Sequence, residues 1–569
     1  MSLIPFEQMP YERLEEGELR RQAGEILEKL LRAPDYPAAK DAFIEMQKLS
    51  SHFSTLSAIA NTRSNIDTTD AFYAQQREYW DHLDPVFEEL QQRFTGAMLT
   101  HPFRPQFEEM LGKQYFADGE LAQRSFSPAI APLMQEESKL VMAYDQIMAG
   151  AQIVFDGKTL TLPQLTPYKQ SPHPDIRKAA WCAEGEYLMS HAQQLDDIFH
   201  QLVKLRTEMG RKMGYDTFIP LGYDRMKRNC YGAGQVEAFR EAVRRHIVPI
   251  AAALKRQQAQ RLNTSYPMML SDDSIVFPTG NPLPRGNAQD TLDTARNMYH
   301  QLSPETGAFI DVMFEGHLLD VLSKKGKAGG GYCTTLPDYK VPFIFANFNG
   351  TAGDVEVMTH EAGHAFAAYM ARDIVALEQR WPTLEACEVH SMSMEFFAEE
   401  WSENFFGADA DKFRYSHLAS ALTFIPYGTI VDAFQHEIYR QPELTPMQRH
   451  EVWKRLEADY RPWLDLKEIP FYQDGRGWQA KQHIFQAPFY YIDYCLAQTV
   501  ALQFWALIRE NRDAAWNRYL SLVKMAGTRT FTELLAISGL KTPFDETCLQ
   551  QIAQTAQQFL QDFPTEKLR

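Results

Sequence analysis

Cysteine is scarce in this chain. Its 569 residues contain six cysteines, and no two of them form a C-x-x-C pair. So few cysteines cannot supply a disulfide framework, and we expect reduced thiols of the kind found in a cytoplasmic protein. The plain interpretation of each one is a small buried apolar side chain with no chemical role.

The sequence also lacks membrane and export signals. It has no run of about 18 apolar residues, which a membrane-spanning helix requires. Its N-terminus carries neither the basic stretch nor the apolar stretch of a secretory signal. We therefore expect no membrane partner and a cytoplasmic location.

Positive charge is in deficit. The chain has 57 Lys and Arg residues against 74 Asp and Glu residues, a formal net charge of −17 at pH 7. An acidic chain repels phosphate backbones, so we expect no nucleic-acid partner. The hydrophobic content of 45% is enough for a large core and for more than one lobe.

No internal repeat or low-complexity tract is present, and helices dominate the first half of the chain. A short hairpin is predicted around Asp156-Gly157, where two short apolar runs flank a turn signal. Apolar residues at helical spacing predict the long helices, which cover 11–31, 38–61, 71–94 and 132–148.

Proline and glycine gather in 270–285, and we interpret this segment as the passage between lobes. The expected division is a mostly helical N-terminal lobe, 1–280, and a catalytic lobe with C-terminal helices, 281–569.

The most informative stretch is 360–364, which reads His-Glu-Ala-Gly-His and has the pattern H-E-x-x-H. Its flanks have apolar residues at helical spacing, and residues four apart on a helix share one face. His360 and His364 can therefore bind one cation, and Zn2+ accepts imidazole nitrogen readily. Glu361 lies about 100° around the helix from His360, where it can reach a water molecule beside the metal and act as a base.

The pentapeptide alone has a plain alternative, a surface helix with two solvated histidines. Gly363 argues against it, because glycine inside a helix costs about 1 kcal/mol relative to alanine. A glycine between the two histidines allows another segment of the chain to approach this helix closely.

A third ligand is expected from the next helical stretch, 384–400. A catalytic zinc site takes three protein ligands and keeps a fourth position open. Glu388 is a candidate, and spacing alone does not exclude its rivals Glu385 and Glu395. Because Glu388, Ser391 and Glu395 share one helix face, Glu395 can instead orient a histidine ligand. The alternative for each glutamate is a solvated helix face.

Residues 340–350, just before the metal helix, read as a strand, and Pro342 suggests an edge strand. An edge strand offers its amides and carbonyls to an extended peptide. We expect such a peptide to lie along Ala346, Asn347 and Phe348. A structural hairpin without a binding role is the alternative.

The glycine-rich segment 324–333, which contains Gly330 and Gly331, is interpreted as a flexible loop over a cleft. A phosphate-binding loop is discounted, since the P-loop pattern is absent.

The stretch 481–494 places His483 close to three tyrosines, Tyr490, Tyr491 and Tyr494. Imidazole and phenol groups can donate hydrogen bonds to an oxyanion that forms at a metal site. The alternative is an aromatic helix start that packs in the core.

These stretches together resemble the thimet oligopeptidase–oligoendopeptidase F family of zinc metallopeptidases, in particular its bacterial oligoendopeptidase F, Pz-peptidase-like branch. The likeness at the level of motifs covers roughly 324–500. Its matching parts are His-Glu-Ala-Gly-His, the Gly-Gly-Tyr-Cys loop, and the stretches 388–395 and 483–494.

The resemblance implies a mainly α-helical, clam-like molecule with a deep channel and a thermolysin-like zincin core that carries a small β-sheet. The N-terminal lobe would contribute to both sides of that channel. It also implies Glu388 as the third ligand of one Zn2+ per chain. His483, Tyr491 and Tyr494 would face the scissile carbonyl, with Tyr490 as a rival. Oligopeptides would be the substrates, because a folded protein cannot thread such a channel.

The expected function is a zinc metalloendopeptidase that cleaves internal bonds of short unstructured oligopeptides, with Glu361 as the general base. One alternative is a zinc-dependent exopeptidase, for which no motif that captures a free amine is evident. The other is an inert peptide-binding protein, which would have no use for Glu361.

Overall fold

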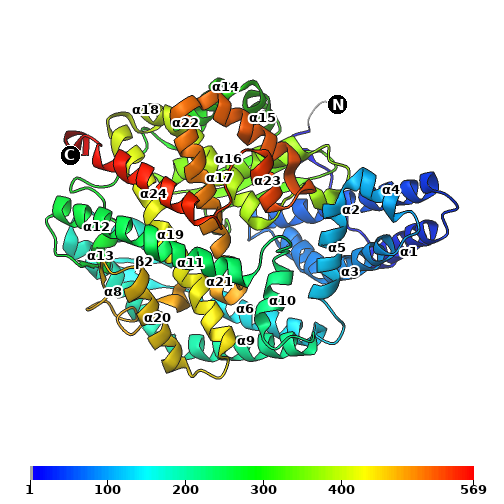
Figure 1. Ribbon diagram of the computed structural model, residues 1–569, viewed down its shortest axis with the longest axis horizontal. Helices are drawn as coiled ribbons and strands as arrows, with labels where there is room; N and C mark the ends of the chain where they lie inside the picture. The colour runs from blue at the N-terminus through cyan, green and yellow to red at the C-terminus, as the bar shows by residue number, and fades with distance from the viewer. Residues whose placement is uncertain (1–3, 569) are drawn as a thin grey trace. The chain divides into compact units, whose positions relative to one another are not determined.

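Helices carry most of the chain in the computed structural model, which describes residues 4–568 (Figure 1). The predicted fold class, mainly α with a small β-sheet, is confirmed. The clam-like shape and the deep channel stay predictions.

The chain divides into two compact units, and each is built from three separate stretches. Unit 1 consists of Met1–Gln123, Leu283–Gly407 and Leu507–Leu540, and unit 2 consists of Arg124–Pro282, Ala408–Ala506 and Lys541–Arg569. The sequence-based division has two continuous lobes instead, 1–280 and 281–569. Apolar periodicity shows which segments are helical, but it does not show which distant segments pack into one core.

The first helices of unit 1 pack against one another around aromatic side chains, and Figure 1 shows α1, α2 and α3 side by side in blue. Phe53 and Phe87 stack with ring centroids 4.0 Å apart at the centre of this group. The helices expected at 11–31, 38–61 and 71–94 are present with somewhat different ends, and two further helices that the sequence analysis did not predict follow them. The five helices are α1 (Glu16–Leu31), α2 (Tyr36–Ile66), α3 (Ala71–Leu99), α4 (Arg104–Leu111) and α5 (Lys113–Ser125).

The remainder of unit 1 surrounds a three-stranded sheet. Its strands are β4 (Leu319–Leu322), β5 (Tyr332–Leu336) and β6 (Val341–Phe348). Its helices are α14 (Ala288–Leu302), α15 (Pro304–Glu315), α16 (Gly353–Ala371), α17 (Leu384–Ala398), α18 (Ser402–Phe406) and α23 (Phe531–Ile537). The long helix α22 (Ile492–Met525) begins in unit 2 and ends in unit 1.

The edge-strand prediction for 340–350 is wrong. The strand order is β4-β6-β5, so β6 is the central strand, parallel to β4 and antiparallel to β5. Pro342 is tolerated there because β4 is too short to reach it. The pairing of β6 with β4 begins at Ile344, whose N–H donates to the carbonyl of Leu318 at 2.9 Å. Pro342 lies two residues before Ile344, so its missing N–H would point toward β4, at a level that β4 does not reach.

Unit 2 contains the predicted hairpin. Its strands are β1 (Ile153–Phe155) and β2 (Lys158–Leu160). Asp156 and Gly157 form the turn with φ values of +50° and +69°, which suits a two-residue hairpin loop.

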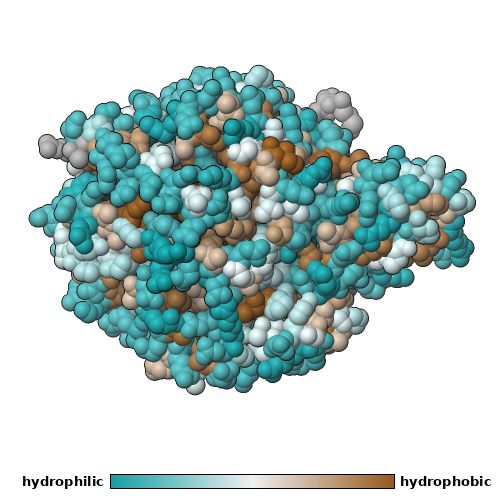
Figure 2. All heavy atoms as spheres, in the orientation of Figure 1, coloured by the Kyte–Doolittle hydropathy of each residue, from teal (hydrophilic) through white to brown (hydrophobic). Residues whose placement is uncertain are grey.

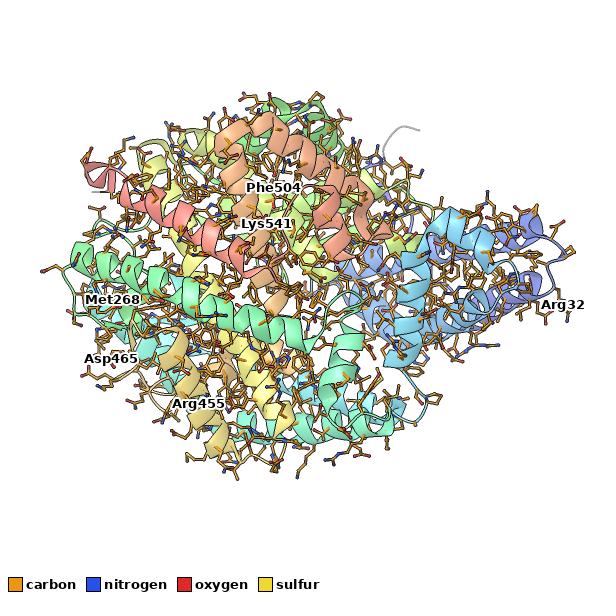
Figure 3. All side chains as sticks on the ribbon, viewed as in Figure 1. Arg32, Met268, Arg455, Asp465, Phe504 and Lys541 are labelled. Carbon is orange, nitrogen blue, oxygen red and sulfur yellow. The ribbon has the colours of Figure 1, made fainter. Side chains whose placement is uncertain are left out.

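The other elements of unit 2 are helices and one small parallel strand pair, β3 (Met268–Met269) with β7 (Leu464–Asp465). Figure 3 labels Met268 and Asp465, which lie close together at this pair. The helices are α6 (Ala131–Ala149), α7 (Leu162–Lys169), α8 (Pro174–Ser190), α9 (Ala192–Lys212), α10 (Phe218–Arg225), α11 (Ala233–His246), α12 (Val248–Leu262), α13 (Leu270–Asp273), α19 (Ala410–Arg440), α20 (Pro446–Tyr460), α21 (Gln482–Gln486) and α24 (Glu546–Gln561).

Hydrophilic residues cover most of the face shown in Figure 2, and hydrophobic residues appear between them in scattered patches. Across residues 4–568, no helix has both the length and the apolar character needed to span a membrane. None of the six cysteines, all of which lie in the described range, forms a disulfide, as the sequence predicts.

Candidate metal centre and active site

Helix α16 begins at a turn that is closed by the carboxylate of Asp354, a residue in its first helical turn. Asp354 accepts hydrogen bonds from the backbone N–H groups of Asn349 and Gly350, both at 2.8 Å. An acidic residue in the first helical turn satisfies free amides and suits the positive end of the helix dipole. This turn joins the end of β6 directly to the helix that carries His360 and His364.

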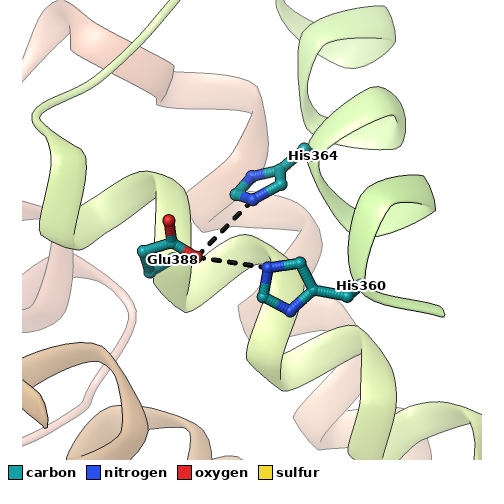
Figure 4. A group of neighbouring side chains, drawn as sticks. All are labelled: His360, His364 and Glu388. Atoms are coloured by element: carbon teal, nitrogen blue, oxygen red, sulfur yellow. Dashed lines mark ion pairs between the residues drawn. The ribbon is translucent and has the colours of Figure 1, made fainter. Parts of the chain in front are cut away.

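Three side chains, His360, His364 and Glu388, converge between α16 and α17. In the part of the chain that the structure describes, no other group of three or more His, Cys, Asp or Glu residues has metal-binding geometry. Glu388 Oε2 lies 3.4 Å from His360 Nε2 and 3.5 Å from His364 Nε2. The three ligand atoms lie within 4.8 Å of one another. Figure 4 shows the two histidines reaching from one helix toward the glutamate on the other.

These distances suit a shared cation better than direct hydrogen bonds. A good N–H···O hydrogen bond measures about 2.9 Å. Ligands about 2.1 Å from a tetrahedral zinc ion lie about 3.4 Å apart. The cluster therefore fits a zinc-sized ion held by His360, His364 and Glu388.

Gly363 explains how α17 comes so close to α16. A Cβ atom at this glycine would lie 2.7 Å from Ser391 Cα, 2.9 Å from the His390 carbonyl oxygen and 3.0 Å from Met394 Cβ. Such separations are well below ordinary contact of about 3.5–4.0 Å between carbon atoms. The close approach that the sequence predicts at Gly363 is confirmed, and the approaching segment is the helix that carries Glu388.

The second ring nitrogen of His360 is held by Glu395. Its Nδ1 lies 2.6 Å from Glu395 Oε1, which leaves Nε2 to face Glu388. Burial lowers the pKa of His360, but the carboxylates of Glu388 and Glu395 more than compensate and raise it well above its usual value. The surroundings of this ring thus favour positive charge, whether a proton or a metal cation supplies it.

The rival glutamates have other partners. Glu385 accepts a hydrogen bond from Thr383 Oγ1 at 2.9 Å and does not belong to the three-residue cluster. Glu388 accepts a hydrogen bond from Ser391 Oγ at 3.1 Å. Burial raises the pKa of Glu388, but His364 and His360 hold it well below its usual value, so Glu388 is a carboxylate.

Further contacts hold the two helices, and sequence reasoning missed them. The Tyr519 hydroxyl donates to the His390 carbonyl at 2.8 Å, and the Tyr299 hydroxyl donates to the Met358 carbonyl at 3.0 Å. The Tyr519 ring also stacks on Phe366 of α16. These tyrosines are far from the motif in sequence, so no local pattern could have assigned them to it.

His390 is a buried histidine beside the cluster that the sequence analysis left without a role. Burial, with the nearby charge of His364, lowers the pKa of His390 to about 3, so its ring is neutral. It lies two residues after Glu388 on α17 and is buried.

Glu361 lies next to the cluster with its carboxylate available. The side chain is half-buried and forms no hydrogen bond or ion pair with any residue in the range 4–568. Burial and the charge of Glu361 raise the pKa of Cys333 well above its usual value, so this β5 thiol stays protonated.

Strand β5, not β6, supplies an open edge of the sheet in unit 1. Its neighbouring residues face opposite ways: the Tyr332 hydroxyl accepts from Asn65 of α2 at 2.9 Å, whereas Cys333 faces Glu361 of α16. Asn347 of β6 donates to the carbonyl of Gly330 at 3.0 Å and so holds the glycine loop that leads into β5.

The predicted stretch 481–494 lies in unit 2 and forms an aromatic cluster. The His483 ring centroid lies 4.9 Å from that of Tyr491 and 5.8 Å from those of Tyr490 and Tyr494. Lys481, to which the sequence analysis gave no role, contacts the hydroxyl of Tyr491 at 3.2 Å. The metal cluster belongs to unit 1, so the roles of these residues in a common reaction stay predictions.

Fold and cluster together define a helical protein with a candidate metal-binding cluster, and comparison with known proteins gives its family. A family model described as Peptidase M3 N-terminal domain matches residues 6–126, and one described as Peptidase family M3 matches residues 306–554. Comparison with curated proteins gave no match.

Solved structures match over nearly the whole chain. An X-ray structure assigned as oligoendopeptidase F is 41% identical, with a TM-score of 0.94, over 99% of this chain and 100% of that chain. A structure of PZ peptidase A with an inhibitor is 42% identical, with a TM-score of 0.94, over 98% and 99%. A protein from Bacillus anthracis assigned as oligoendopeptidase F is 39% identical, with a TM-score of 0.90, over 100% of both chains.

The chain belongs to peptidase family M3, and the resemblance to the oligoendopeptidase F family is confirmed. It is therefore an enzyme, an oligopeptidase of the metallopeptidase class. The identity of the metal and the roles of single residues go beyond this finding.

Proposed function

We propose that the protein is a zinc metalloendopeptidase that hydrolyses internal peptide bonds of short unstructured oligopeptides. One observation carries this proposal: three side chains with ligand geometry converge beside a glutamate that has no other partner among the described residues.

One Zn2+ per chain would be held by His360, His364 and Glu388. Two imidazoles and one carboxylate form a usual donor set for catalytic zinc, and they leave a fourth position open. When bound, the zinc ion supplies Lewis acidity, which polarises a carbonyl group and lowers the pKa of a water molecule.

Glu361 is the general base in this proposal. Its carboxylate takes a proton from the attacking water molecule and later passes it to the leaving amine. Because no described residue occupies this carboxylate, it needs no rearrangement before it accepts the proton.

His483, Tyr491 and Tyr494 are proposed donors to the oxyanion that forms on the scissile carbonyl. Tyr490 remains a rival to the other two tyrosines. The loss of one such donor typically slows turnover by about 100–1000-fold. The aromatic cluster supports this assignment, since packed rings hold such donors in place before the reaction.

The substrate peptide is proposed to add to the open edge of β5, where backbone amides and carbonyls are available. Gly330 and Gly331, just before β5, leave room for a peptide backbone. Ala346, Asn347 and Phe348 stay predicted contacts, although β6 itself has neighbouring strands on both sides.

The test is cleavage of an internally quenched peptide of about ten residues, blocked at both ends, with and without a chelator. Activity that disappears with the chelator and returns with zinc supports an endopeptidase. Cleavage of free-ended peptides only would favour an exopeptidase, and zinc binding without any cleavage would favour an inert binder.

Glu361→Gln should retain zinc and abolish turnover, because it removes the base and keeps the size of the side chain. Glu356→Gln changes an exposed glutamate on the same helix and should leave both the zinc content and the turnover unchanged. His360→Ala should lose the metal, as measured by atomic absorption. Near wild-type cleavage by Glu361→Gln contradicts the assignment of the base.

The cytoplasmic location and the expected absence of nucleic-acid and membrane partners stay predictions from composition.

A further inference from the structure

Lys481 of unit 2 is a half-buried lysine whose hydrogen-bond acceptor is a phenol. It lies between the 3-10 helix Gly477–Ala480 and helix α21. Its Nζ is 3.2 Å from the hydroxyl oxygen of Tyr491 and 5.2 Å from the ring centroid of Tyr427. Among the described residues, no carboxylate forms an ion pair with it. A partly buried ammonium without a carboxylate partner is uncommon and calls for a reason.

The bond between Lys481 and Tyr491 has a fixed direction. An ammonium group has three donors and no acceptor, so the hydroxyl oxygen of Tyr491 must be the acceptor. The single hydroxyl proton of Tyr491 must therefore point elsewhere. Within residues 4–568, no group accepts a hydrogen bond from it, so the proton remains available to a bound molecule.

Both groups keep the required protonation at neutral pH. Burial raises the pKa of Tyr491 to about 12, although the neighbouring Lys481 lowers it, so the phenol retains its proton. Burial lowers the pKa of Lys481, but the phenols of Tyr427 and Tyr491 raise it above its usual value, so the amine stays charged.

The ring of Tyr491 is held on several sides. Its centroid lies 4.9 Å from that of His483, 5.3 Å from that of Tyr494 and 5.9 Å from that of Phe424. On the side of α19, a Cβ atom at Gly428 would lie only 3.6 Å from Tyr491 Cδ1. With the ring held, the remaining freedom is rotation of the hydroxyl about its C–O bond, and the bond from Lys481 restricts that rotation.

We propose that Lys481 is a positioning residue that fixes the Tyr491 hydroxyl and leaves the hydroxyl proton free to be donated to the substrate oxyanion of the proposed mechanism. The inference rests on the proposed peptidase mechanism and goes further in two respects. It selects Tyr491 among the three tyrosines, and it gives a role in the reaction to a lysine outside the recognised motifs.

The test is a double-mutant cycle on the zinc-loaded full-length enzyme with Lys481→Met, Tyr491→Phe and the double variant. Tyr491→Phe should lower kcat by about 100–1000-fold. Lys481→Met should lower kcat by about 10–100-fold with KM nearly unchanged, because it misaligns a donor that acts in the transition state. The double variant should be no slower than Tyr491→Phe alone, since Lys481 acts through the hydroxyl.

Three controls separate positioning from general damage. Lys481→Arg keeps a charged donor and should recover most of the lost kcat. Lys467→Met removes a lysine whose side chain is 87% exposed and should behave as wild type. Zinc content and the thermal unfolding midpoint should remain unchanged in Lys481→Met, and Lys481→Gln replaces that variant if it does not fold.

The inference would be overturned if Lys481→Met lowered kcat by the same factor in the wild-type enzyme and in the Tyr491→Phe variant. Wild-type kcat in Lys481→Met or in Tyr491→Phe would overturn it as well. Failure of the proposed function gives a different pattern. The wild-type enzyme would then be inactive or insensitive to the chelator before any variant is compared, and this inference would fail with it.

Discussion

The contact at Gly363 gives the sharpest test of how the metal centre is built. Gly363→Ala adds one methyl group where α16 meets α17. The nearest atom, Ser391 Cα, would be 2.7 Å from the new Cβ, and it is a backbone atom that cannot rotate away. Ordinary carbon contacts lie near about 3.7 Å, so α17 must retreat by about 1 Å.

The expected effect on stability is modest, because two contributions oppose each other. Overpacking of a core contact typically costs about 1–3 kcal/mol. Replacement of a helical glycine by alanine gains up to about 1 kcal/mol in helix propensity. The free energy of unfolding should therefore fall by about 0–2 kcal/mol, and the variant should still fold.

The expected effect on the metal site is much larger. Glu388 lies one helical turn before Ser391 on α17, so it moves with that helix away from His360 and His364. Metal–ligand distances tolerate about 0.2 Å, and a displacement of about 1 Å of a reacting group can lower a rate about 100-fold. We expect zinc affinity to fall by at least about tenfold and kcat/KM by about 100-fold.

Three assays decide the outcome: competition with a zinc-binding dye, cleavage of a quenched peptide, and chemical denaturation of the metal-free protein. Gly24→Ala in α1 is the matched control, because a Cβ atom there meets nothing within 4 Å. It should raise stability by up to about 1 kcal/mol and leave zinc affinity and turnover unchanged. Wild-type zinc affinity and turnover in Gly363→Ala would refute the argument that this glycine sets the position of Glu388.

Two further predictions concern Glu395 and a buried ion pair in unit 2. Glu395→Gln weakens the hydrogen bond that orients His360, so zinc affinity should fall by about 10–100-fold, and an unchanged dye titration would deny Glu395 this role. Asp432→Asn breaks the buried pair with Arg240 and should lower the free energy of unfolding by about 3–5 kcal/mol at pH 7. Burial raises the pKa of Asp432, but His436 and Arg240 bring it below its usual value. The stabilisation by Asp432 is therefore fully present above the pKa that this residue has in the unfolded protein, about 3.9. It disappears as the pH falls through the lower pKa that Asp432 has in the folded protein. The stability difference between wild type and variant should shrink below about pH 4, and a constant difference in urea titrations would contradict the assignment.

The three residues of the candidate metal cluster were predictable to different degrees. His360 and His364 lie four residues apart on one helix, so local periodicity is enough to bring them together. Glu388 lies on another helix, and spacing left Glu385 and Glu395 as rivals until the family resemblance was considered. The structure separates the three glutamates by their partners, since only Glu388 among them faces both histidines.

Other features depend on long-range packing and leave no local pattern. Pro342 correctly signals a missing donor, but the length of β4 decides that β6 is nevertheless central. Tyr519 supports α17 from a distant part of the chain. The division into two units, each made of three separate stretches, also depends on long-range packing. Helical periodicity within a segment does not specify which other segments pack against it.

One of the two residues that the H-E-x-x-H pattern leaves open, Gly363, is as informative here as the three that it specifies. In the proposed site, His360, Glu361 and His364 would supply two ligand atoms and a base, but they cannot bring a third ligand within reach. Gly363 allows that, because α17 can approach only where α16 lacks a Cβ atom. A larger residue at this position would still satisfy the pattern and would hold Glu388 too far away. Gly363 thus belongs to the proposed metal site through packing. Its cost in helix propensity relative to alanine is the feature of the sequence that indicates this role.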